Sequence, residues 1–102
     1  MQTISGLMQE YDQLAAGLCV SARADKTLPR QQADRVIELI GEIGKFYAKE
    51  DHVLKDHVWR LNYLFPQLLS ESEHCRDVDK KEILERYAWN VQFQVSKIFK
   101  SD

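Results

Sequence analysis

Three histidines and a few nearby carboxylates are the side chains of this chain that could carry acid–base or metal chemistry. His52 and Asp56 are four residues apart, a spacing that would place both on one helix face. Neither His57 nor His74 forms a His-x-x-x-His pair with His52, the kind of spacing that a metal site on a helix uses. No nucleophile stands beside a base, and there is no glycine-rich phosphate loop. We therefore expect no metal site, no cofactor and no enzymatic activity.

The stretch His-Val-Leu-Lys at positions 52–55 resembles the core His-x-Leu-Lys motif of histidine phosphotransfer (HPt) domains. The resemblance implies that His52 accepts a phosphoryl group on the surface of a helical bundle, with Lys55 helping to hold it. The chain departs from the family pattern at Asp56, where the family has a small residue, usually glycine. A carboxylate at that position would repel the phosphoryl group. An HPt-like domain with His52 as phosphoryl acceptor is therefore the alternative function.

Two pairs of aromatic side chains stand apart from the apolar stripes of their predicted helices. Trp59 and Tyr63 are four residues apart, and so are Trp89 and Phe93, so the members of each pair are neighbours on a helix surface. At about 100° of rotation per residue, both pairs lie opposite the apolar positions of their segments. Large amphipathic rings outside a core are typical anchors of a protein-binding surface.

Charged residues flank these rings, and three of them form the expected rim of a binding surface: Arg60, Glu85 and Arg86. Two other interpretations stay open. The rings complete the core if their helices are buried on two sides, or if Pro66 rotates the third helix. Alternatively, the same face joins two copies of the chain in a homodimer.

The composition is that of one folded domain covering residues 1–102, without the signs of a nucleic-acid-binding protein. Fourteen Lys and Arg face sixteen Asp and Glu, giving a net charge of −2. The two signs alternate along the chain, whereas nucleic-acid binding concentrates basic residues on one face. No apolar run reaches the roughly 18 residues that a transmembrane helix needs. We expect neither nucleic acid as a direct ligand nor a membrane as a partner.

The N-terminal residues and the cysteines indicate a cytoplasmic protein. Residues 1–6 lack the basic and apolar regions of a secretory signal. Cys19 and Cys75 have neither metal-binding nor redox spacing, so reduced thiols are the simpler interpretation. We expect no disulfide.

Helical periodicity runs through nearly the whole chain, and no segment shows the alternation of a strand. It divides into four segments of roughly 20 residues joined by short connections, which predicts an all-α, antiparallel four-helix bundle of roughly equal helices. The first segment should end near Arg23 and the second should begin near Leu28. The expected N-caps are Thr3 or Ser5, Thr27, Asp51, and Asp77 or Asp79.

Each segment has an apolar stripe that should face the core. The predicted stripe of the first segment is Ile4, Leu7, Met8, Tyr11, Leu14, Ala15, Leu18 and Ala22. That of the second is Ala33, Val36, Ile37, Ile40, Ile43 and Tyr47, widened on one side by Leu39 and Phe46. The predicted stripe of the third is Leu54, Val58, Leu61, Phe65 and Leu68, and that of the last is Ile83, Leu84, Tyr87, Val91, Val95 and Ile98.

The third segment is the hardest to delimit. No glycine or proline follows Gly44 until Pro66, so residues 28–65 form either one rod of roughly 55 Å or two helices. We favour a break near the polar residues 49–52, because so long a rod could not bury its stripe in a monomer of this size. Pro66 removes a helical hydrogen bond and should kink or restart the third helix. Residues 70–76 are then predicted to form a polar connection.

These features together favour a non-catalytic helical module for protein–protein interaction. It would act as a small accessory subunit of a larger assembly, or as an inhibitor or immunity-type protein that binds and occludes a partner. Its partner would be another protein or a second copy of the chain. The residues expected to bind the partner are Trp59, Tyr63, Trp89 and Phe93, with the rim residues Arg60, Glu85 and Arg86.

Overall fold

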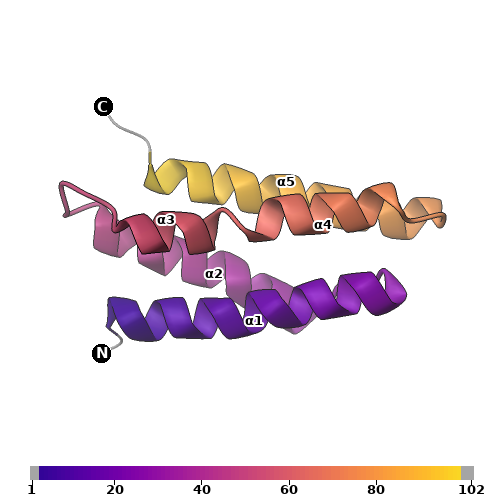
Figure 1. Ribbon diagram of the computed structural model, residues 1–102, viewed down its shortest axis with the longest axis horizontal. Coiled ribbons are helices and arrows are strands. Elements are labelled where there is room, and N and C mark those ends of the chain that lie inside the picture. The colour runs from indigo at the N-terminus through magenta and orange to yellow at the C-terminus, as the bar shows by residue number, and fades with distance from the viewer. Residues whose placement is uncertain (1–2, 100–102) are drawn as a thin grey trace.

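A computed structural model describes residues 3–99 of the chain, and within that range it contains helices and no strand. The helices are α1 (Ile4–Asp25), α2 (Arg30–Tyr47), α3 (Lys55–Leu61), α4 (Leu64–Glu73) and α5 (Val78–Ile98). Figure 1 shows α3 and α4 following one another along the same side of the molecule, so together they form one bent member of a four-helix bundle. The predicted all-α four-helix bundle is confirmed.

The helices pack as a ring that differs from their order in the sequence. The closely packed pairs are α1–α2, α2–α5, α4–α5 and α1–α4. In this ring α2 and α4 are diagonal, so the connection after α2 crosses the end of the bundle to reach α3. Members that follow one another in the sequence run in opposite directions (Figure 1). The neighbours α4 and α5 lie side by side (Figure 1). The outer surfaces of α4 and α5 therefore form one shared face of the molecule.

One apolar stripe from each member fills the core. The largest fully buried side chains are Met8, Tyr11, Leu18, Val36, Leu39, Ile40, Ile43, Leu61, Leu64, Leu68, Leu84 and Val91. The stripes predicted for the first two helices are confirmed, since the buried residues of α1 and nearly all of those of α2 belong to them. Of the two residues predicted to widen the α2 stripe, Leu39 is buried and Phe46 is exposed.

The stripes of the other two members are confirmed in part, since Leu61, Leu68, Leu84, Val91 and Val95 are buried as predicted. In α3 and α4 the buried side chains are His57, Leu61, Leu64, Leu68 and Ser72. Leu54 is exposed and lies outside the helix, and Val58 and Phe65 are only partly buried. In α5, Ala88 is buried and Ile83 is exposed.

Two predicted helix starts are confirmed. The Thr3 Oγ1 accepts a hydrogen bond from the Gly6 N–H at 3.0 Å, which caps α1. The Asp77 carboxylate caps α5 by accepting from the N–H groups of Asp79 and Lys80 at 3.0 and 3.1 Å. These bonds satisfy amides that have no partner inside the helix. The first helix ends at Asp25, two residues beyond the predicted end.

Two other predicted caps are wrong. The helix α2 begins after Pro29 with no side-chain cap, so Thr27 lies outside it. The residue before a proline is held in an extended conformation, which keeps the helix from starting earlier. The helix α3 begins after Leu54 and not after Asp51. There the Leu54 N–H donates to the Tyr47 hydroxyl at 3.4 Å, so a side chain of α2 fixes the entry into α3.

The third member breaks and restarts, as predicted, but upstream of Pro66. Helix α3 ends at Leu61, Asn62 has φ −90° and ψ 0°, and α4 begins at Leu64. Pro66 consequently lies in the first turn of α4, where amides have no acceptor inside the helix and a proline is tolerated. Helix α4 then continues to Glu73, through half of the predicted connection 70–76. Residues 28–65 therefore do not form one rod, because α2 ends at Tyr47 and α3 begins only after the connection 48–54.

Candidate interaction surface

The four predicted anchor rings stand outside the core of the described chain. Trp59 is 72% exposed, Tyr63 45%, Trp89 54% and Phe93 59%. None of them belongs to the cluster of buried side chains that fills the interior. The isolated chain therefore completes its core without these rings, and the interpretation that they belong to the core is not supported.

Trp59 and Tyr63 border an open hollow at the junction of α3 and α4. The hollow has a volume of about 570 Å³, and its lining also includes Val58, Asn62 and Pro66. The break at Asn62 leaves Trp59 in α3 and Tyr63 immediately before α4. The bend of the third member thus creates a depression with an indole and a phenol on its walls.

A second open hollow lies along α5. Its volume is about 480 Å³, and it is lined by Val78, Lys81, Glu82, Glu85, Arg86 and Trp89. Two of the predicted rim residues, Glu85 and Arg86, thus lie beside Trp89. Arg86 also pairs with Glu82 one turn away at 2.7 Å.

A contact between two aromatic rings joins α4 to α5. The Phe65 and Trp89 centroids are 4.8 Å apart, with an angle of 59° between the ring planes. Phe65 also packs against the core, so it anchors Trp89 to α4. Phe93 lies under the Lys97 ammonium, whose Nζ is 4.5 Å from the ring centroid. We call this surface the aromatic face and define it as Trp59, Tyr63, Phe65, Trp89 and Phe93.

Phe65 is the member of the aromatic face that the helical periodicity does not reveal. The periodicity predicts Phe65 in the core stripe, because an uninterrupted projection aligns it with Leu61 and Leu68. The structure buries Leu64 instead and leaves Phe65 at the α5 side of α4. No feature of the sequence around Phe65 indicates that Leu64 is buried in its place.

Arg60, the third predicted rim residue, is engaged across the bundle. Its Nε donates to Asp12 Oδ2 at 2.7 Å, its Nη2 also contacts that oxygen, and its Nη1 donates to Asp56 at 2.9 Å. The hydrogen bond with Asp12 raises the pKa of Arg60. Arg60 therefore ties α3 to α1 and is not a free cation at the rim of the aromatic face.

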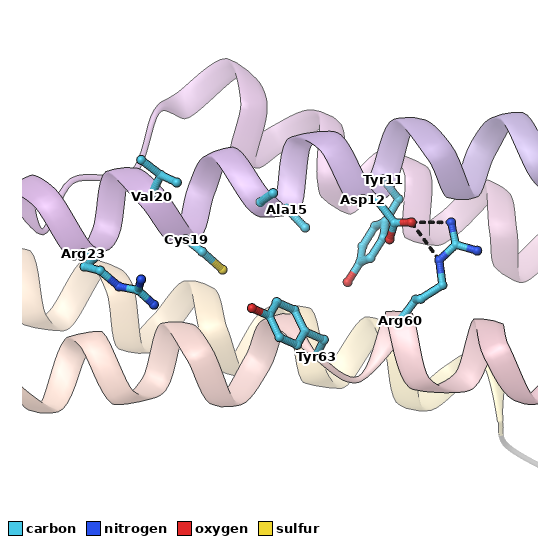
Figure 2. Close-up of a pocket in the computed structure, with 9 residues that line it drawn as sticks. Tyr11, Asp12, Ala15, Cys19, Val20, Arg23, Arg60 and Tyr63 are labelled. Carbon is cyan, nitrogen blue, oxygen red and sulfur yellow. Dashed lines mark hydrogen bonds and ion pairs between the residues drawn. The ribbon is translucent and has the colours of Figure 1, made fainter.

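A cavity of about 390 Å³ lies between α1 and the α3–α4 junction (Figure 2). Tyr63 forms one wall, opposite Ala15 and Cys19 of α1, and the Arg60–Asp12 pair closes one end. Burial raises the pKa of the Cys19 thiol, which keeps it in the weakly nucleophilic neutral form. The Tyr11 hydroxyl donates to the Leu61 carbonyl at 3.3 Å, and burial raises its pKa. This lining provides no activated nucleophile.

The residues of the phosphotransfer-like motif do not share a helix. His52 is exposed in the connection between α2 and α3, and Lys55 is the first residue of α3. His52 therefore does not lie on one helix face with Lys55 and Asp56. Among residues 3–99, no group of three or more His, Cys, Asp or Glu side chains could hold a metal ion. Both cysteines are free.

His57 has the environment of a structural residue, and its burial is not predicted by the periodicity. Its Nδ1 is 2.5 Å from the hydroxyl of Tyr47, and both side chains are buried. Because the Tyr47 oxygen accepts from the Leu54 N–H, its proton is free to donate to a neutral imidazole. Burial lowers the pKa of His57, and the charge of Arg60 acts in the same direction. This contact fastens the 48–54 connection to α3.

Comparisons with known protein families, with curated proteins and with solved structures give no match for this chain. Within residues 3–99, no helix has both the length and the apolar character needed to cross a membrane.

Proposed function

We propose that this chain is a non-catalytic helical module that binds another protein chain through the aromatic face. The observation that supports it best is the exposure of two indoles, a phenol and a phenyl ring outside a core that is complete without them. A fully buried aromatic side chain removes roughly 150–250 Å² from water, so these four rings leave roughly 450 Å² exposed. The largest apolar patch on a typical monomer has roughly 300–600 Å² and is often functional, so an exposed area of this size supports a binding role.

The aromatic face is held by contacts that would reduce the entropy lost on binding. The Trp89 ring contacts Phe65, which packs against the core. Trp59 belongs to α3, which the Arg60–Asp12 ion pair ties to α1 and the His57–Tyr47 contact ties to α2. Rings fixed before binding lose less conformational freedom when a partner covers them. Such a surface suits a small accessory subunit, or an inhibitor that occludes its partner.

Site-specific photo-crosslinking tests this proposal and requires no candidate partner. The chain would carry Phe93→p-benzoylphenylalanine, and the matched control would carry the same residue at Gln13, an exposed position of α1. We expect irradiation of cells producing the two variants to give a discrete protein adduct from position 93 and none from position 13. Adding Trp89→Ser should weaken the adduct, because it removes a neighbouring anchor. Equal labelling from both positions, or none from position 93, would refute the proposal.

A further inference from the structure

On the basis of the function proposed above, we infer that the partner is a second copy of this chain. The two copies pack about a two-fold axis, and Trp59 of each enters the hollow beside Trp89 of the other. In a two-fold interface the same surface meets itself, so every projection on it needs a matching hollow on that same surface. The aromatic face meets this condition, with the 72% exposed Trp59 on α3 and the hollow of about 480 Å³ on α5.

The exposed apolar area agrees with that of one side of a stable dimer. A standard interface removes roughly 800 Å² from each partner, of which a little over half, roughly 450 Å², is apolar. The four exposed rings supply about this area by themselves, at roughly 450 Å². The face therefore has the apolar surface of one complete interface side.

The charges around the hollow on α5 favour a copy of the same chain over a strongly charged partner. The hollow is lined by two cations, Lys81 and Arg86, and by two anions, Glu82 and Glu85. This set is neutral overall, and Arg86 already pairs with Glu82, so the hollow does not attract a strongly charged partner. The net charge of −2 per chain adds little repulsion between copies.

The mass of the purified full-length chain in solution is the first test. Light scattering coupled to size-exclusion chromatography should give twice the mass of one chain at high concentration, falling toward one on dilution. Trp59→Glu should give a monomer at every concentration. Gln13→Glu adds a negative charge on α1, at an exposed residue, and should still dimerise. Circular dichroism would verify that both variants remain helical.

A charge-exchange experiment tests the arrangement itself, in which the hollow of one copy receives position 59 of the other. One variant carries Trp59→Glu. The other carries Glu82→Lys and Glu85→Lys, so the charged residues that line its hollow are all basic. An equimolar mixture of the two should form a heterodimer that native mass spectrometry resolves, because the carboxylate introduced at position 59 meets the basic hollow. Trp59→Glu mixed with Gln13→Glu, whose hollow is unchanged, should form less heterodimer.

A monomeric wild-type chain would overturn the inference, and so would a dimer that survives Trp59→Glu or equal amounts of heterodimer in the two mixtures. The function proposed above is judged separately, by the adduct at position 93. An adduct with a different protein, together with a monomeric purified chain, would leave that function standing and remove only the second copy as partner.

Discussion

Trp59 and Leu61 are two residues apart in α3 and have opposite environments. Leu61 is fully buried in the core, whereas Trp59 is mostly exposed. Their positions separate the two roles that a large apolar side chain has in this chain. Leu61 stabilises the isolated fold by burial, and Trp59 gains burial only when a partner covers it.

We expect Trp59→Ala to change the free energy of unfolding by less than about 1 kcal/mol, because an exposed ring gains little burial on folding. Leu61→Ala should reduce that free energy by about 2–5 kcal/mol, since it deletes buried atoms and leaves a cavity. Urea denaturation followed by circular dichroism, at a concentration where the chain is monomeric, would measure both. Comparable losses from the two changes would assign Trp59 to the core.

At the scale of single residues, the sequence predicts exposure better than it predicts neighbours. The projection of the helices places the two tryptophans off the apolar stripes, and their exposure agrees with this. The same projection pairs Trp89 with Phe93, whereas its ring contact is with Phe65 of another helix. The burial of His57 depends on the hydroxyl of Tyr47, a residue of α2. Contacts between helices leave no trace in a local periodicity.

At the scale of elements, the start of α3 depends on a contact that is sensitive to pH. The His57 imidazole is neutral when it accepts from the Tyr47 hydroxyl. The burial of the ring and the charge of Arg60 oppose its protonation, and Asp56 and Asp12 favour it. Because the first two effects are larger, the pKa of His57 in the folded chain lies below its ordinary value of 6.5. The unfolded chain therefore binds a proton at a higher pH than the folded chain does.

We therefore expect the contribution of His57 to stability to be complete above pH 6.5 and to decrease as the pH falls from 6.5 toward the folded pKa. The slope for one proton is at most about 1.4 kcal/mol per pH unit. Urea unfolding at a series of pH values between neutral and mildly acidic would measure it. His57→Gln should flatten this dependence, and His52→Gln, which removes an exposed imidazole, should not. An unchanged slope in His57→Gln would exclude this role for His57.

The helix ends show which capping residues can be predicted from the local sequence and which cannot. Thr3 and Asp77 cap their helices through bonds within three residues, so the sequence pattern was sufficient to predict them. Thr27 has the right chemistry, but Pro29 delays the start of α2. The start of α3 is fixed by the distant hydroxyl of Tyr47 and not by Asp51. A cap formed by another helix cannot be found from residue spacing.

At the scale of the whole molecule, the periodicity predicts four helical members but not their arrangement. Apolar stripes such as Leu7, Tyr11 and Leu18 show which side of a helix is buried. They do not show which helix lies next to it, and the diagonal relation of α2 and α4 is not visible in them. The aromatic face depends on this arrangement, because the packing of α4 against α5 brings Phe65 to Trp89. This contact between rings of two helices could not be predicted from the sequence.

Quenching of tryptophan fluorescence by acrylamide tests the exposed aromatic face most directly. It would be measured in the variants Trp89→Phe and Trp59→Phe, each of which retains one tryptophan. In dilute solution, where the chain is monomeric, both indoles should be quenched readily, and Trp59 should become shielded as the concentration rises and a second copy covers it. Shielding of both indoles in the monomer would contradict the structure described above, because the rings would then belong to the interior and no aromatic face would exist.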